Sequence, residues 1–388
     1  MIHNFNADRN SKITSFSVSK FLIAAGDTER FDRKSDEVVL VFRNDRRKRF
    51  GSVYMPVAPL QNIGNGPSPY PRTFGGLLGG RIIAGNANGI YQYNIETKNW
   101  MYIDTSVKLY VDGDHLEHNN FNRLPNCELR GCAINDELYL LWVGKPGCRF
   151  ELLQFTKCKP NPTFNSNQVD VLYHDEWDFQ WFQMDRLSQQ NEELQTLERS
   201  IVNFNISIRQ HFSDITLPSI TNVGKNKVMF VGGVYHGKTQ TSKRAFIGEL
   251  TTDNRLLRWK ELENITVGRS RAIIFKLKDM VYLTGGRIID VEPSLYYDDI
   301  RPSFVKLCER FDIREEKWSD SKHTLPYPLH SASAVVSADD SFALITGGFR
   351  DRTLQNDKII IFDEKNGFQV LDSNLRCSRS NHVSMLIQ

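Results

Sequence analysis

Short apolar segments that end in glycine recur along the whole chain. Three of them (VMFVGG, VYLTGG, FALITGG) end at Gly233, Gly286 and Gly348, and three weaker ones (FLIAAG, RIIAG, LYLLWVG) end at Gly26, Gly85 and Gly144. Successive glycines of this series lie 53 to 62 residues apart, except for one interval of 89 residues. The interval that runs from Gly348 through both chain ends to Gly26 is 66 residues. A period of this length is typical of a repeat architecture, and here it predicts six units that close on themselves.

A second pattern follows the glycines within each unit: an apolar segment, a polar turn and a segment with a bulky aromatic residue. Tyr93 and Trp100 flank NIETKN, and Phe311 and Trp318 flank DIREEK. Another weak apolar segment and a polar turn precede the glycines, as in RAIIFKLKDMVYLTGG. Apolar segments separated by short polar turns indicate antiparallel hairpins. Each unit is therefore predicted to form four antiparallel strands, with the aromatic residues packed between neighbouring units.

The two ends of the chain complement each other. The C-terminal segment RSNHVSMLIQ resembles the predicted first strand RSRAIIFKLK at 269–278, whereas the N-terminal segment SKFLIAAG begins at the second-strand position. We therefore expect the C-terminal strand to complete the N-terminal unit. Such pairing removes exposed sheet edges, which otherwise promote aggregation.

These units resemble kelch repeats, whose blades carry a diglycine after the second strand and a spaced aromatic pair in the third and fourth strands. The resemblance covers residues 16–388 and implies one all-β, six-bladed kelch-type β-propeller with four antiparallel strands per blade, closed by the C-terminal strand. Residues 1–15 are expected to form an N-terminal tail. Within an insertion at 185–214, the segment RLSQQNEELQTLERSI places its apolar residues on one side of a helix, which predicts a loop/helix insertion.

Composition and charge narrow the classes of partner. The 49 Lys and Arg residues nearly balance the 46 Asp and Glu residues. The sequence pI is 8.4, whereas nucleic-acid-binding domains typically have a pI above about 9. No apolar stretch approaches the roughly 20 residues of a membrane-spanning helix. We expect neither a nucleic acid nor a membrane as partner. The N-terminus lacks the apolar segment of a secretory signal, which favours the cytoplasm, and the basic run at 43–49 makes the nucleus the alternative.

Motifs of catalysis and metal binding are missing from the sequence. The nine histidines form no HxH or HExxH, the six cysteines form no CxxC, and no GxSxG, GxGxxG or Walker-type phosphate loop is present. We therefore predict no catalytic residues, no metal and no cofactor, and we expect that the chain is not an enzyme.

The longest connections indicate the binding face. In four alternating strands, the loop between strands two and three lies on the same face as the link to the next unit. These loops are long at 234–244 and 287–304, and long loops on a rigid scaffold often carry function. Arginine and tyrosine are frequent anchors of interfaces. The candidate binding residues on this face are Tyr235, His236, Lys238, Arg244, Arg287, Tyr296, Tyr297, Arg301 and Arg350.

The kelch resemblance implies a non-catalytic protein–protein interaction module, either a scaffold or a substrate receptor, that works with a ubiquitin ligase or the cytoskeleton. The ligand is expected to be a protein or peptide segment of acidic or mixed charge, because arginine pairs with carboxylates through two hydrogen bonds. The alternative is a carbohydrate-active enzyme similar to sialic-acid mutarotases, with a sugar bound at the mouth of the channel. The sequence leaves both open.

Overall fold

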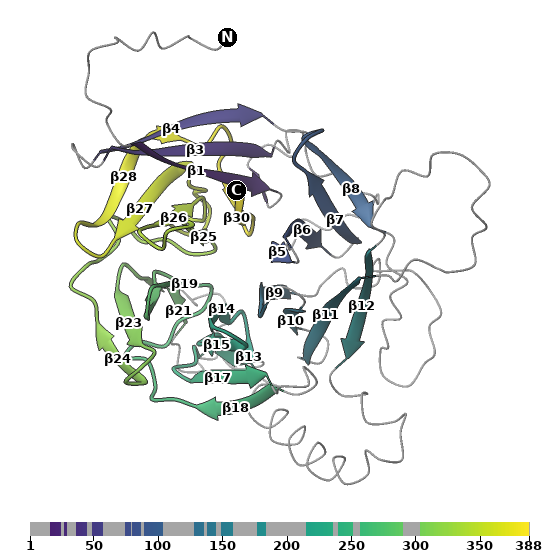
Figure 1. Cartoon of the computed structure of the whole chain (residues 1–388). Coiled ribbons are helices and arrows are strands. Elements are labelled where there is room, and N and C mark those ends of the chain that lie inside the picture. Colours follow the sequence, from purple (N-terminus) through teal and green to yellow (C-terminus); the bar gives the residue numbers. More distant parts are fainter. Residues whose placement is uncertain are drawn as a thin grey trace, which may run out of the picture.

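The computed structural model describes residues 16–24, 27–28, 36–44, 49–56, 74–78, 80–86, 89–103, 128–135, 138–144, 149–157, 177–183, 215–235, 240–250, 257–289 and 303–387. The predicted N-terminal tail and the insertion at 185–214 lie outside these residues. Within them every regular element is a β-strand, and none is a helix that could span a lipid bilayer. The chain folds as an all-β propeller, with sheets arranged around a common centre (Figure 1).

The described residues form six four-stranded antiparallel sheets, here numbered along the chain. Sheet 1 contains β30 (Val383–Ile387), β1 (Phe16–Ala24), β3 (Glu37–Asn44) and β4 (Arg49–Pro56). Sheet 2 contains β5 (Phe74–Leu78), β6 (Arg81–Asn86), β7 (Gly89–Asn94) and β8 (Asn99–Ile103). Sheet 3 contains β9 (Glu128–Ala133), β10 (Leu138–Gly144), β11 (Arg149–Lys157) and β12 (Trp177–Gln183).

The second half of the chain repeats this arrangement. Sheet 4 contains β14 (Ser219–Gly224), β15 (Lys227–Val231), β17 (Ala245–Leu250) and β18 (Leu257–Glu261). Sheet 5 contains β19 (Ile273–Leu277), β20 (Met280–Thr284), β23 (Cys308–Asp312) and β24 (Lys317–Asp320). Sheet 6 contains β25 (Ser333–Val336), β26 (Ala343–Thr346), β27 (Lys358–Asp363) and β28 (Gly367–Asn374).

Three two-stranded sheets are formed by short strands of the connections. They pair β2 (Asp27–Thr28) with β29 (Arg379–Ser380), β13 (Ile215–Thr216) with β16 (Val234–Tyr235), and β21 (Arg287–Ile288) with β22 (Ser303–Phe304).

The C-terminal strand β30 belongs to the N-terminal sheet. It pairs with β1 in antiparallel register, from Lys20 opposite Ile387 to Ala24 opposite Val383. The innermost strands contact one another in the order β30, β5, β9, β14, β19 and β25, and β25 contacts β30 again. Strand β30 therefore occupies the first-strand position that the sequence pattern of RSNHVSMLIQ indicates.

The glycine doublets are required by the close approach of the next link. Gly285 and Gly286 have φ of +65° and +97°, and a Cβ added at Gly285 would lie 2.2 Å from the carbonyl oxygen of Leu329. The amide of Gly286 donates a hydrogen bond of 2.8 Å to that same oxygen. Gly347 and Gly348 repeat this contact with Arg379. Glycine is the residue that accepts both the positive φ and the missing space.

The aromatic residues of the repeat fill the space between sheets. Trp318 of sheet 5 is 7% exposed and packs with Phe311, the two ring centroids being 5.1 Å apart. Both belong to a cluster that includes Val231 and Ile247 of sheet 4. Trp100 of sheet 2 packs in the same way against a cluster shared with sheet 1. The expected packing of these aromatic residues between neighbouring units is thus present at both sites.

Candidate functional site

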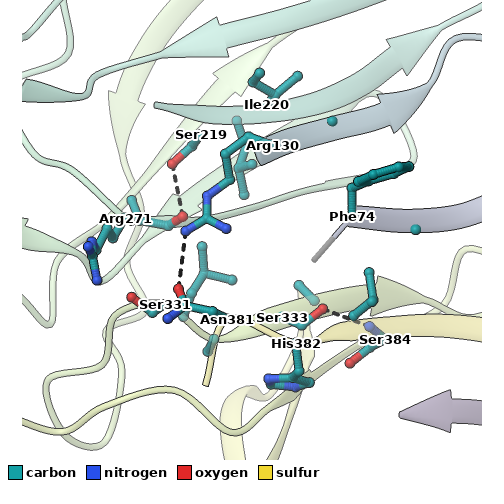
Figure 2. A pocket seen from close by; sticks show the side chains of 18 of the residues that line it. Phe74, Arg130, Ser219, Ile220, Arg271, Ser331, Ser333, Asn381, His382 and Ser384 are labelled. Carbon is teal, nitrogen blue, oxygen red and sulfur yellow. Dashed lines mark hydrogen bonds between the residues drawn. The ribbon is translucent and has the colours of Figure 1, made fainter. Parts of the chain in front are cut away.

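A cavity of about 160 Å³ lies at the centre of the ring, between the innermost strands (Figure 2). It lies close to the first residues of these strands, where the links enter and the glycine doublets end the second strands. All six sheets contribute to it. Its lining residues are Phe74, Gly75, Arg130, Gly131, Pro218, Ser219, Ile220, Arg271, Ala272, Ile273, Ile274, Ser331, Ala332, Ser333, Ala334, Asn381, His382, Val383 and Ser384. The cavity therefore opens towards the face that carries the long loops.

One residue in each of four links forms a rim around the cavity. Leu217, Arg271, Ser331 and Asn381 have φ of +56°, +53°, +55° and +49°. Their amides form a chain of hydrogen bonds: Arg271 donates to the carbonyl of Leu217 at 3.2 Å, Ser331 donates to Arg271 at 3.0 Å, and Asn381 donates to Ser331 at 3.0 Å. These bonds join one link to the next, so they hold the rim in a single conformation.

The polar side chains that line the cavity are those of arginine, serine, asparagine and histidine. Arg130 reaches from β9 towards Asn381, and its Nη2 donates to Asn381 Oδ1 at 3.3 Å (Figure 2). The Ser333 hydroxyl accepts a hydrogen bond from the amide of Ser384 at 2.9 Å. The guanidinium of Arg271 is turned away from that of Arg130 in this view. Among the described residues that line the cavity there are two arginines and no aspartate or glutamate.

The histidines near the cavity are neutral at neutral pH. His382 is buried, its Nε2 lies 2.8 Å from Thr346 Oγ1, and burial together with the charge of Arg379 lowers its pKa well below the usual value. His330 stacks between Phe304 and Phe349 at centroid distances of 5.2 and 5.4 Å. Burial is the main cause that lowers the pKa of His330 to about 4, and nearby arginines lower it further. The positive charge of the cavity therefore comes from arginine.

Four of the candidate binding residues lie within the described part of the chain. Tyr235 lies in β16 and Arg287 in β21. The Arg244 guanidinium binds both carboxylate oxygens of Glu261, at 2.7 and 3.0 Å, and lies over the ring of Phe246. The other five candidates, His236, Lys238, Tyr296, Tyr297 and Arg301, lie outside the described residues.

Arg350 is the fourth described candidate. Its Nε donates to Asn356 Oδ1 at 3.0 Å, and its guanidinium lies 4.1 Å from the ring centroid of Tyr327. None of the four described candidates lines the central cavity. Tyr235 and Arg244 lie in the connection between β15 and β17, Arg287 in the connection after β20 and Arg350 in the connection after β26, and the four do not form one pocket with the central cavity.

Sequence reasoning missed the residues of the cavity, above all Arg130, Arg271, Ser331 and Asn381. A signal for three of them was present, because Arg271 in RSRAIIF, Ser331 in HSASAVV and Asn381 in RSNHVSM hold the same position relative to the first strand. Loop length, from which the binding face was predicted, gives no indication of residues in short links. No comparable sequence signal marks Arg130.

On the opposite face, two ion pairs join neighbouring sheets. On that face Lys260 of sheet 4 pairs with Glu316 of sheet 5, and Lys278 of sheet 5 pairs with Glu364 of sheet 6 at 3.2 Å. These turns are short, and their charges join neighbouring sheets. Within the part of the chain that the structure describes, no group of three His, Cys, Asp or Glu side chains could hold a metal ion.

Comparisons with known proteins identify no family. No family model matches the chain, and no curated protein matches it. Among solved structures it is similar to one titled "Structure of YjhT", with 11% sequence identity and a TM-score of 0.49, over 90% of this chain and 97% of that chain.

Proposed function

We propose that this chain is a non-catalytic, kelch-type propeller of six blades, closed by its C-terminal strand, that binds a protein or peptide segment on the loop-rich face. The observation that carries the proposal is the difference between the two faces. On the face with short turns, ion pairs such as that of Lys278 with Glu364 join neighbouring sheets. The loop-rich face surrounds a cavity that holds two arginines and no carboxylate among its described lining residues.

Complementary charge attracts and orients a partner on such a face. The partner that this favours is acidic or of mixed charge, in agreement with the expectation from the loops. A ligase or cytoskeletal partner remains a prediction of the kelch resemblance, and a cytoplasmic location remains a prediction from the N-terminal sequence.

The cavity favours binding over catalysis on a sugar. General acid–base catalysis needs a titratable group within hydrogen-bond reach of the reacting atoms. The one histidine that lines the cavity, His382, is hydrogen-bonded to Thr346 and keeps a lowered pKa. Serine, asparagine and arginine side chains bind polar groups well, but they are weak acids and bases at neutral pH. The sugar-active alternative therefore stays second.

Charge reversal on the two faces tests the proposal. A partner is first isolated with the full chain as bait, and its Kd is then measured for the wild type and for two double variants. Arg287→Glu with Arg350→Glu changes the loop-rich face, and Lys98→Glu with Lys365→Glu changes exposed turns of the opposite face. We expect the first pair to weaken binding at least tenfold, about 1.4 kcal/mol, and the second pair to have little effect.

Thermal unfolding of both double variants shows whether each is folded. Equal losses of affinity from the two pairs would show that the charge of the whole protein decides binding. A loss from the second pair alone would place the partner on the opposite face and refute the proposal.

A further inference from the structure

The rim residues are held in place by the backbone, whatever their side chains. Asparagine adopts positive φ readily, but leucine and arginine rarely do. Leu217 and Arg271 nevertheless share the conformation of Asn381, because the chain of amide-to-carbonyl bonds fixes all of them. Backbone strain of this kind is often concentrated at functional sites. At the rim the backbone conformation does not depend on the side chain, so the side chain is available to contact a ligand.

Two rim side chains, those of Ser331 and Asn381, lie in the same small space as the side chains of Ser333 and Arg130. Asn381, Ser331 and Ser333 line the cavity together with Arg130, whose guanidinium points towards Asn381 (Figure 2). The contact of Arg130 with Asn381 Oδ1, at 3.3 Å, is to the oxygen of a neutral amide. A carboxylate is a stronger acceptor, because it takes two parallel charge-assisted bonds from a guanidinium.

We propose that this cavity binds a carboxylate group, with Arg130 as its main donor and with Asn381, Ser331 and Ser333 completing the site. The inference rests on the proposed function and names the chemistry at its centre. A carboxylate displaces the Asn381 oxygen from Arg130, and the asparagine amide nitrogen and the serine hydroxyls then donate to it. Arg271 at the rim adds positive charge. The volume of about 160 Å³ is that of a side-chain-sized group, not of a folded segment.

Two sources supply such a group: an acidic side chain of a bound peptide and a small free carboxylate. Ligand-observed NMR with the full chain separates them. The peptide source is represented by N-acetyl-glutamic acid N-methylamide and the free source by succinate. The matched neutral probes are N-acetyl-glutamine N-methylamide and succinamide. Inorganic phosphate tests for a general anion site.

We expect at least one carboxylate probe to bind in the millimolar range and its neutral counterpart to bind at least tenfold more weakly. Arg130→Gln should abolish this preference, and Asn381→Ala should weaken it. The control Arg258→Gln removes an exposed arginine outside the cavity and should leave it unchanged. The probe that binds more tightly identifies the source of the carboxylate.

Three results overturn the inference: no binding of either carboxylate by the wild type, equal binding of acid and amide, or an unchanged preference in Arg130→Gln. Phosphate that competes as well as the carboxylates shows a site without the proposed selectivity and also overturns it. If the face variants weaken the partner while Arg130→Gln does not, this inference fails and the proposed function stands. If neither set of variants weakens the partner, both fail.

Discussion

Arg379 and Glu37 join the last link of the chain to the first sheet through a buried ion pair. Sheet 6 has Leu329 and Ile360 at the corresponding positions, so the perturbation is to replace the ion pair with Leu and Ile. Both charged side chains are 1% exposed, and Arg379 Nη2 donates to Glu37 Oε1 at 2.9 Å. The Glu37 carboxylate also accepts from the amides of Arg376 and Cys377, at 3.0 and 3.4 Å. Sheet 5 repeats the pair as Arg269 with Glu309, both fully buried.

Sheet 6 has apolar residues at the positions of this ion pair. Leu329 stands where Arg379 does, because Gly286 donates to its carbonyl as Gly348 donates to that of Arg379. Ile360 lies opposite Ile345 as Glu37 lies opposite Ile23. Pro326 takes the place of Arg376, three residues before the link residue, and so removes the amide that needs the carboxylate. Leu329 and Ile360 are fully buried.

The expected magnitudes follow from burial. Arg379→Leu alone leaves a buried carboxylate without its cation, which costs about 3–5 kcal/mol of the free energy of unfolding. Glu37→Ile alone leaves the buried cation and also takes the acceptor from the amides of Arg376 and Cys377, so it should cost more than Arg379→Leu. The double variant removes both charges but leaves the two amides without an acceptor, at about 1–3 kcal/mol each. We therefore expect it to be more stable than Glu37→Ile, which leaves the same amides and a buried cation as well, and we expect Arg376→Pro in the triple variant to recover about 1 kcal/mol or more.

Urea unfolding followed by tryptophan fluorescence measures these differences, and the cycle of single and double variants gives the interaction energy of the pair. A coupling of at least 2 kcal/mol is expected. Single effects that simply add in the double variant, within about 0.5 kcal/mol, would refute the reasoning, since additivity is the behaviour of residues that do not interact.

Two further predictions concern stability. Trp318→Ala should lower the free energy of unfolding by about 3–5 kcal/mol, because it leaves a large space between sheets 4 and 5, and an unchanged urea midpoint would contradict this packing. The pKa of His330 is lowered to about 4 from 6.5. Because the unfolded chain takes up the proton first, the contribution of His330 to the free energy of unfolding is fully present above pH 6.5 and falls by about 3 kcal/mol as the pH drops towards 4. His330→Gln should reduce this dependence in pH-resolved unfolding, and equal slopes for variant and wild type would show that His330 titrates normally.

The repeat could be predicted from the sequence because local geometry requires particular residue types, glycine and large aromatic residues, at fixed positions of each unit. The doublet at Gly285 and Gly286 leaves no space for a Cβ, so it must recur wherever a link crosses in this way. Trp318 and Trp100 fill the gap between sheets, and a small residue cannot do so. The pairing of β30 with β1 could be inferred because RSNHVSMLIQ repeats the pattern of a first strand.

The central cavity could not be predicted in the same way, because it is assembled from six distant links and strands. Arg130 and Asn381 are 251 residues apart in the sequence and meet only across the channel. The spacing of the repeat gives the order of the strands, but it does not give the side chains that face the centre. The choice of Arg244 for the binding face shows the limit, since its guanidinium is held by Glu261 of its own sheet.

In the links, a residue that holds the sheets together and a residue of the proposed binding site lie only two positions apart. Arg379 is buried, receives the amide of Gly348 at its carbonyl and pairs with Glu37, so it belongs to the contacts that join the sheets. Asn381 follows two residues later, where the rim fixes its backbone through the amide and leaves the side chain in the cavity. In sheet 6 the corresponding residues are Leu329 and Ser331, so both positions have changed while the backbone bonds have not. If the proposed site binds a ligand, side chains at the rim can therefore change without loss of the contacts that hold the sheets together.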